Sequence, residues 1–286
     1  MNNPLEKLKE HVGSLPRSQK LVVDYIIGHY TEVGFMTVEQ LATKVGTSTT
    51  TVMRLMANVG YSGYSDFQKN LQIVLREESA PQIRLEENLR NRTHSEGWRR
   101  HYELQLDQIQ RVTELNTEEN LAEAVKLVTN ARNRYCTSVR SGLPVAQYLT
   151  HNLNRMIGQT KLTLADSSDW ADDVISFSDQ DVLIAVSYSR YGSRLMDYVN
   201  HAKKKGTKII TITDKLSSPL TPYSDVMITC PADSLASHNS IVSSIFVVDY
   251  LISALSVEKS ESISKRLTEV DGILKDMEYH VYKKRE

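Results

Sequence analysis

Apolar residues between positions 35 and 67 recur at the three- and four-residue spacing of short amphipathic helices. The first set is Val38, Leu41, Ala42 and Val45, and the second is Val52, Leu55, Met56 and Val59. Thr37 with Gln40 can form a capping box before the first set, and Ser48 can cap the second. Gly46 and Gly60 fit the positions after a helix where the backbone adopts the left-handed conformation that ends it. The pattern predicts a helix-turn-helix followed by a third short helix.

The second predicted helix opens with STTTVMR, so small hydroxyl residues precede an arginine. Such side chains can approach base edges and phosphates closely, as those of a recognition helix do. The candidate DNA-contacting residues are Lys44, Ser48, Thr49, Thr50, Thr51 and Arg54. The spacing is equally typical of an ordinary helical hairpin in an all-α domain, so the pattern by itself leaves both interpretations open.

From residue 132 onward, short β-rich runs alternate with helical segments. The expected strands are 134–139, 161–165, 181–187, 207–213 and 225–230, and the expected helices between and after them are 141–157, 169–176, 193–205 and 238–257. Continuous apolar strands alternating with helices indicate a parallel sheet covered on both faces. We therefore expect an all-α N-terminal domain plus an α/β flavodoxin-like domain, whose five-stranded parallel sheet has the order 2-1-3-4-5.

Composition changes between these two regions suggest where the domains meet. We expect a helical domain over 1–79, a linker and connecting helix over 80–115, an α/β domain over 116–260 and a charged C-terminal helix or tail over 261–286. The stretch 79–97 is polar, contains Pro81 and lacks strong periodicity, which is typical of a linker. A length of 286 residues fits two domains of about 100–200 residues each.

The charge and cysteine content narrow the possible functions. The formal net charge is −1, and residues 1–79 hold eight Lys or Arg against eight Asp or Glu. Neither the whole chain nor this region therefore has the excess positive charge typical of a protein that binds a polyanion. The two cysteines, Cys136 and Cys230, have no His or Cys at ligand spacing, so we predict no disulfide framework, metal or cofactor. The apolar run 241–255 is interrupted by serines and Asp249, which excludes a membrane span. No signal peptide is evident, and a cytoplasmic location is expected.

Hydroxyl-rich loops follow the first and third predicted strands, where a 2-1-3-4-5 sheet has its switch point. Both loops lead into helix N-termini, which attract anions such as phosphate. The candidate ligand-binding residues are Ser141, Ser187, Ser189, Arg190, Ser193 and His238. The alternative is that the serines are simply helix caps.

Two long segments carry a resemblance to a known family. The stretch SYSRYGSRLMDYVNHAKKKGTKIITITDKLSSPLTPYSDVMITCPA resembles the second half of a sugar isomerase (SIS) domain, with its Ser-x-Ser loop. The stretch FMTVEQLATKVGTSTTTVMRLMANVGYSGYSDFQKNL resembles the helix-turn-helix of RpiR-type transcriptional regulators. Together they resemble an RpiR-family regulator over essentially the whole chain. The resemblance implies a homodimer, a duplex DNA operator and a phosphosugar effector bound between the serine loops.

The chain departs from the family pattern in both loops. Thr137 and Val139 stand where the first loop often has glycines, and Arg190 replaces the glycine of the second loop. Gly192 stands where that second loop often has a threonine. Loss of the first-loop glycines narrows the pocket or shifts the ligand, because glycine lets the backbone approach a ligand closely.

Two other classes of function remain open. SIS domains also occur in aldose–ketose isomerases, which need a general base. The candidate bases are Asp166, Asp169, Asp173, His238 and Glu258. A fused helix-turn-helix has no use in a free isomerase, so we expect a non-enzymatic regulator. The third possibility is a protein-interaction module with a vestigial pocket.

A single uncharged helix-turn-helix would bind DNA weakly, whereas a symmetric pair gains affinity through effective concentration. We therefore expect a homodimer or higher homo-oligomer on an inverted-repeat operator. The segments 98–115 and 241–255 are the surfaces expected to be buried between the copies.

Overall fold

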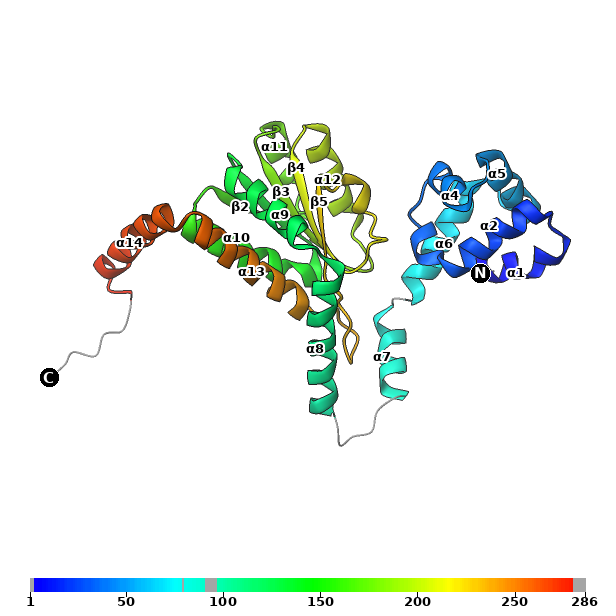
Figure 1. The fold of residues 1–286 in the computed structure, drawn as a ribbon, viewed down its shortest axis with the longest axis horizontal. Helices are drawn as coiled ribbons and strands as arrows, with labels where there is room; N and C mark the ends of the chain where they lie inside the picture. Colours follow the sequence, from blue (N-terminus) through cyan, green and yellow to red (C-terminus); the bar gives the residue numbers. More distant parts are fainter. Residues whose placement is uncertain (1–2, 79, 91–96, 280–286) are drawn as a thin grey trace. The chain divides into compact units, whose positions relative to one another are not determined.

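The computed structural model describes residues 3–78, 80–90 and 97–279, which form two compact units. The first unit contains the helices α1 (Pro4–His11), α2 (Arg17–Gly28), α3 (Tyr30–Val33), α4 (Val38–Val45), α5 (Thr49–Asn58), α6 (Tyr64–Glu78) and α7 (Pro81–Arg90), as Figure 1 shows. The second unit is an α/β domain, preceded in the chain by α8 (Gly97–Leu115). None of the helices in these described ranges has the length and hydropathy needed to cross a bilayer.

Local capping explains the predicted helix-turn-helix, which the structure confirms. The Thr37 hydroxyl accepts the backbone N–H of Gln40, and the Gln40 side chain accepts the backbone N–H of Thr37. Gly46 then ends α4 with φ of 71°, and the Ser48 hydroxyl accepts the N–H of Thr51 to begin α5. A capping hydroxyl is worth about 1 kcal/mol, so these two caps fix the turn between the helices.

The apolar stripes of these helices meet in one core. Leu41 of α4, together with Val52, Leu55 and Met56 of α5, is fully enclosed, and Phe67 of α6 joins them. Each large side chain buried in this way stabilises the fold by about 1.5–3 kcal/mol. Because these buried residues face inward, the opposite face of α5 is left in solvent.

Five parallel strands form the sheet of the second unit, in the order β2-β1-β3-β4-β5. The strands are β1 (Arg134–Ser138), β2 (Thr160–Leu164), β3 (Val182–Ser187), β4 (Lys208–Thr213) and β5 (Val226–Thr229). The remaining helices are α9 (Glu118–Asn130), α10 (Leu143–Met156), α11 (Trp170–Ile175), α12 (Ser193–Lys204), α13 (Val242–Glu258) and α14 (Ser260–Asp276). The expected flavodoxin-like strand order is therefore confirmed.

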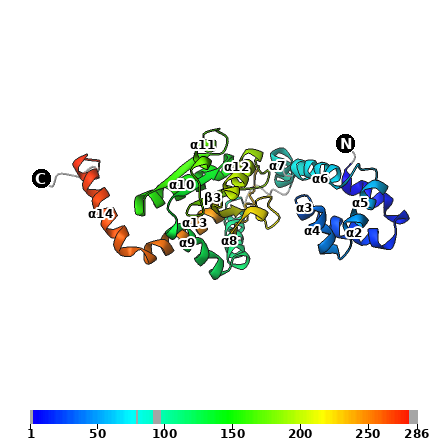
Figure 2. The ribbon, with the colours of Figure 1, turned by 90° about the horizontal axis from the view of Figure 1, so that it is seen from above.

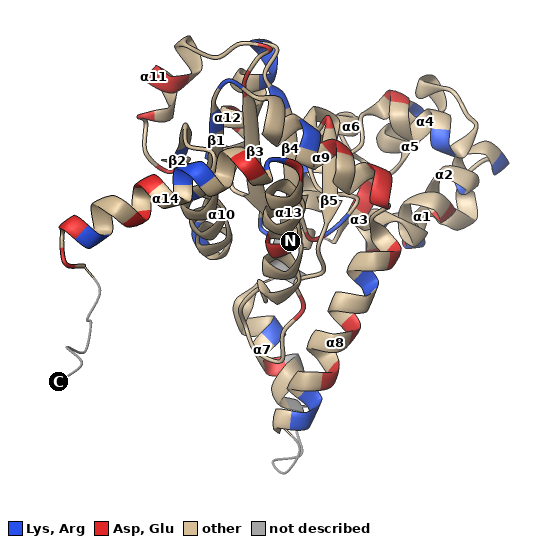
Figure 3. Ribbon diagram, turned by 60° about the vertical axis from the view of Figure 1, so that its left-hand side comes forward, with Lys and Arg blue, Asp and Glu red and all other residues tan. Residues whose placement is uncertain are grey.

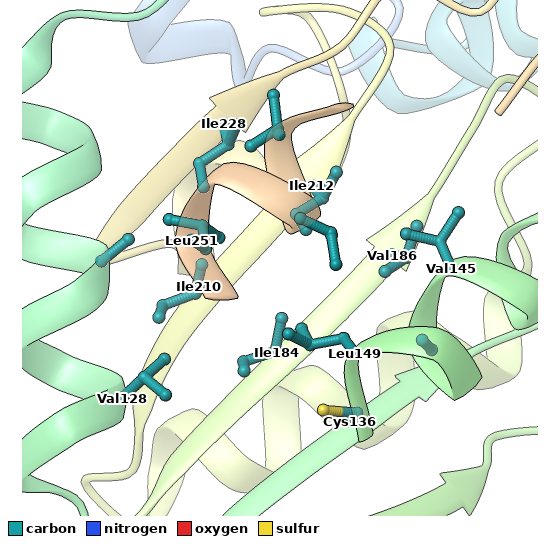
Figure 4. Packing of buried hydrophobic residues seen from close by; sticks show 14 of the residues in the cluster. Val128, Cys136, Val145, Leu149, Ile184, Val186, Ile210, Ile212, Ile228 and Leu251 are labelled. Carbon is teal, nitrogen blue, oxygen red and sulfur yellow. The ribbon is translucent and has the colours of Figure 1, made fainter. Parts of the chain in front are cut away.

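Helices cover both faces of this sheet. Alternate strand residues such as Ile184 and Ile210 share a core with residues of α8, α9, α10 and α13. Figure 4 shows labelled side chains of α9, α10 and α13 in this core. Strand residues on the other face of the sheet, including Leu183 and Ile209, pack against α11 and α12. This arrangement explains why the strands read as continuous apolar runs. Helix α14 continues away from the sheet (Figures 1 and 2), and Ile263 is its one buried residue.

Asparagine side chains satisfy backbone groups on the two edge strands. On β5, Asn116 donates to the Thr229 carbonyl and accepts the Thr229 N–H, each at 2.8 Å. On β2, Asn154 makes the same pair of bonds with Thr160. Asn120 also donates to the Met227 carbonyl. The helices beside the sheet are thus hydrogen-bonded to its edges.

Two sequence expectations differ from the structure. The helix expected from His238 begins only at Val242, because residues 231–241 form a loop in which the Ser234 hydroxyl donates to the His238 carbonyl at 2.5 Å. The polar stretch read as a linker contains helix α7, whereas residues 91–96 lie outside the described residues. Figure 3 shows acidic and basic residues alternating along α8 and α14, as on solvated helix faces.

Candidate DNA-binding and ligand-binding sites

The outer face of α5 presents most of the residues expected to contact DNA. Ser48, Thr49, Thr50 and Arg54 are exposed. Thr51 is half-buried, and its hydroxyl lies 3.0 Å from that of Ser48, so it takes part in the cap. The face therefore offers hydroxyls at the helix N-terminus and a guanidinium one turn later, the kinds of group that recognition helices use on base edges and phosphates. Lys44, in the last turn of α4, is also exposed.

A groove of about 640 Å³ adjoins this face of the first unit. Its lining comes from the start of α4, from Met53 of α5 and from the start of α6. Met36 and Tyr64 give it apolar surface, while Glu39 and Asp66 contribute carboxylates. Because both charged side chains that line it are acidic, this groove is not suited to an anionic ligand.

In the second unit, the loop after β1 packs closely against β3. The Ser138 hydroxyl donates to the Val186 carbonyl at 2.7 Å. A Cβ added to Gly142 would overlap the Ser138 hydroxyl and would lie 3.2 Å from the same carbonyl oxygen. Ser141 belongs to the short 3-10 turn Arg140–Gly142 that precedes α10. Gly142 is therefore required here for close approach of the two segments.

Two buried hydroxyls lie side by side where β3 and β4 end. Ser187 and Thr213 are register partners on adjacent strands, and both are buried. The Thr213 hydroxyl has no hydrogen-bond partner, and no bond to the Ser187 hydroxyl is found within the described ranges. Buried polar groups are normally paired, so these two hydroxyls are suited to a ligand or to ordered water.

The serines of these loops do not cap the helices that follow them. The N-cap residue of α10 is Gly142 and that of α12 is Gly192, and neither helix has a side-chain cap. Ser193 is instead the first residue of α12 and is exposed. The first-turn N–H groups of α12 therefore keep their capacity to bind an anion.

Asp214, which follows β4, organises the loop after β3 and was missed by the sequence interpretation. Its carboxylate accepts hydrogen bonds from the Ser189 hydroxyl, from the Ser189 backbone N–H at 3.1 Å and from the Tyr191 hydroxyl at 2.9 Å. The Ser189 proton is thus committed to Asp214 instead of being free for a phosphate. The only sequence signal was an aspartate placed directly after a buried strand.

Comparison with known proteins identifies the family of both units. A model described as "Helix-turn-helix domain, rpiR family" matches residues 2–78, and a SIS domain model matches residues 127–254. The chain therefore carries an RpiR-family helix-turn-helix domain followed by a SIS domain. RpiR-family proteins of this architecture are helix-turn-helix transcriptional regulators with a SIS domain, so this chain is a DNA-binding regulator in its general class.

Similar proteins span almost the whole chain. An uncharacterised HTH-type transcriptional regulator of Clostridium perfringens is 24% identical, covering 95% of this chain and 99% of the relative. The Vibrio vulnificus NanR protein, solved with ManNAc-6P, has a TM-score of 0.68 at 23% identity and covers 96% of this chain and 99% of its own. The sugar isomerase domain of an RpiR transcription factor from Sphaerobacter thermophilus has a TM-score of 0.58 at 22% identity, covering 60% and 96%. The similar structures confirm the fold.

The positions at which this sequence departs from the RpiR-family pattern have structural consequences. A Cβ added to Gly192 would lie 3.0 Å from a methyl carbon of Val139, so the valine packs beneath the second loop and narrows the space between the loops. Arg190 replaces a glycine and keeps a glycine-like backbone, with φ of 71°. Its side chain is exposed.

The candidate general bases Asp173 and His238 are placed less favourably for catalysis. Asp173 is held by Lys161 at 2.6 Å and Thr163 at 3.0 Å, so its carboxylate has a structural role. His238 is exposed in the loop before α13. Burial raises the pKa of the Cys230 thiol to about 12, so the sulfur is a neutral thiol at physiological pH and not a nucleophile.

Proposed function

We propose that this chain binds an operator in duplex DNA as a homodimer through α5, and that a phosphorylated sugar bound in the SIS domain changes this binding. The DNA-binding part rests on the exposed face of α5, where Thr49, Thr50 and Arg54 are free of the core. The sensing part rests on one observation: Ser187 ends β3, its hydroxyl has no partner within the described ranges, and the loop that follows leads into the uncapped N-terminus of α12.

A phosphate fits this second position for physical reasons. Helix N-terminal amides carry partial positive charge, and a buried hydroxyl can donate to a phosphate oxygen without first losing a protein partner. In this proposal Ser187 and the α12 amides hold the phosphate, Ser141 and Ser193 lie at its margin, and Asp214 holds Ser189 in place. NanR was solved with ManNAc-6P, a phosphorylated amino sugar, which supports the same ligand class.

The DNA-binding part can be tested with a matched pair of variants. A duplex selected from a random library by the wild-type chain serves as the probe, and anisotropy is measured at one salt concentration. Arg54→Ala should weaken binding about tenfold to a hundredfold, because a guanine or phosphate contact is worth about 1–3 kcal/mol. Lys9→Ala, which removes an exposed cation of α1 paired with Glu6, is the control. Equal affinities of the two variants would remove Arg54 from the interface.

The sensing part needs a ligand panel and an activity assay. Thermal unfolding of the full chain is measured with aldose, ketose and amino-sugar phosphates, and Ser187→Ala is compared with Ser264→Ala on the exposed face of α14. A stabilising ligand should lose most of its effect in Ser187→Ala only, since bound ligand stabilises the native state. Absence of any stabilising phosphosugar would contradict this part of the proposal and favour a vestigial pocket.

An isomerase is the second candidate, since SIS domains also occur in such enzymes. The helix-turn-helix and the regulator names of the relatives favour a sensor. Incubation of each stabilising sugar phosphate with the chain, followed by separation of aldose and ketose forms, distinguishes the two. Turnover would establish the enzyme, whereas an unchanged sugar supports the regulator.

A further inference from the structure

Two arginines adopt left-handed backbone conformations in the loops that follow adjacent strands. Arg140, after β1, has φ of 54°, and Arg190, after β3, has φ of 71°. Only Gln159 and Glu278 share this conformation among the non-glycine residues of the described ranges. A positive φ is costly for a residue with a Cβ, and such strain gathers at sites where function requires it. Here both strained residues carry a guanidinium at the carboxyl ends of two neighbouring interior strands.

Neither guanidinium is used by the fold. Both side chains are exposed, and the described part of the chain contains no hydrogen bond or ion pair to either one. Other arginines of this unit are engaged: Arg132 pairs with Asp181, and Arg194 donates to the Asp166 carbonyl at 2.6 Å. No contact within the described part of the protein therefore offsets the backbone strain at positions 140 and 190.

The topology brings these two arginines within reach of a common ligand. Strands β1 and β3 are neighbours, about 4.8 Å apart, and their loops touch through Val139 and Gly192. Asp214 lies on the other side of the β3 loop, after β4. Arg140 lies in the β1 loop, away from Asp214, and Arg190 lies in the β3 loop, so the space between these two loops is the favourable place for an anionic group.

We propose that the ligand carries two anionic groups, a phosphate at Ser187 and a second group, carboxylate or phosphate, held by Arg140 and Arg190. The inference rests on the proposed function, because it places the first phosphate at the α12 N-terminus. Guanidinium groups bind carboxylate and phosphate in a bidentate fashion, so two of them select strongly for a second anion. The effector class is thus a phosphorylated sugar acid or a sugar bisphosphate.

Calorimetry on the full chain with two matched pairs of sugars tests this inference. Fructose 6-phosphate is compared with fructose 1,6-bisphosphate, and glucose 6-phosphate with 6-phosphogluconate. The member with two anionic groups should bind at least about tenfold more tightly in one of the pairs, since charge-assisted bonds are gained there. The first pair reports a second phosphate and the second pair reports a carboxylate.

Variants then connect the preference to the arginines. Arg140→Gly and Arg190→Gly should each remove most of the tenfold preference, because the second anionic group then loses a guanidinium partner. Glycine accepts the positive φ, so thermal unfolding should stay constant or move to higher temperature. Arg155→Ala, an exposed arginine of α10 near Asp271, is the control and should keep the preference.

The possible failures are distinguishable. If sugars with one anionic group bind and the second anionic group adds nothing, the inference is overturned and the proposed sensing function stands. If the preference exists but survives in both glycine variants, the arginine assignment is overturned. If no sugar phosphate of either kind binds to the wild-type chain, the proposed function itself fails.

Discussion

Ser189 and Asp214 are joined by a hydrogen bond from hydroxyl to carboxylate, which ties the loop after β3 to the end of β4. The same carboxylate accepts the Ser189 backbone N–H and the Tyr191 hydroxyl. The conformation of this loop, and with it the start of α12, therefore depends on a residue 25 positions further along the chain.

A double-mutant cycle measures this dependence. Ser189→Ala and Asp214→Ala should each lower the free energy of unfolding of the second unit, and the double variant should cost about 1–3 kcal/mol less than the sum, because one charge-assisted bond is shared. Urea denaturation of the four proteins provides the values. Strict additivity would show that the bond contributes nothing.

Gly142 allows a different prediction, about close packing. Gly142→Ala should destabilise the second unit by about 1–3 kcal/mol, since its methyl group would overlap the Ser138 hydroxyl and press on the Val186 carbonyl. Gly272→Ala is the matched control, because Gly272 lies inside α14 with open space around it and should gain about 0.5–1 kcal/mol. Thermal unfolding that moves both variants in the same direction would contradict the packing argument.

Asp181 makes the stability of the second unit sensitive to acid. Burial alone would raise the pKa of its carboxyl, but hydrogen bonds from Arg132, Ser178 and Asn133 outweigh burial and hold the pKa below its usual value near 3.8. A carboxyl with a lowered folded pKa adds stability at higher pH and loses it as the pH falls through the folded pKa. We expect the free energy of unfolding contributed by this group to be constant near neutrality and to decrease below about pH 4.

A pH series of urea denaturation curves checks this expectation. Asp181→Asn cannot ionise, so it should be less stable than wild type near neutrality and should lose less stability on acidification. Parallel decreases in the two proteins would assign the acid sensitivity to other carboxyls, such as that of Asp225. Burial alone would raise the pKa of Asp225, but hydrogen bonds from Lys203 and from the Ile209 backbone outweigh burial and lower this pKa.

The exposed face of α13 predicts how two copies associate. This helix is apolar on every side, yet Val242, Phe246 and Tyr250 lie exposed at four-residue intervals. An apolar face of this kind is normally covered, so Phe246→Glu should convert a dimer to monomers in sedimentation at micromolar concentration. Ile175→Glu, at an exposed apolar residue of α11 on the opposite face of the sheet, should leave the dimer intact. A monomeric wild-type chain would refute the dimer.

Much of the fold could be predicted because its signals are local. Each strand is a short apolar run, and every expected strand lies within two residues of the observed bounds. The caps at Thr37 and Ser48 are likewise read from neighbouring residues. The start of α13 was misplaced because the loop before it is rich in serine, and hydroxyls there resemble a helix cap.

The candidate site was less accessible from sequence because its geometry depends on distant residues. The role of Asp214 requires that β3 and β4 be neighbours, and Ser189 gives no local sign that its proton is engaged. The left-handed backbone of Arg140 is also invisible, since arginine rarely adopts it. The hydroxyl-rich loops predict a ligand site at the carboxyl ends of β1 and β3, but the sequence does not show which hydroxyls remain unpaired.

Asn116 and Asn154 each occupy backbone groups at an outer edge of the sheet. The outermost strands of an open sheet offer unpaired N–H and C=O groups on which another chain can add a strand. Here one amide side chain at each edge occupies both groups of a threonine, Thr229 on β5 and Thr160 on β2, in the way a neighbouring strand would. Both edges are thereby closed to strand addition at these points.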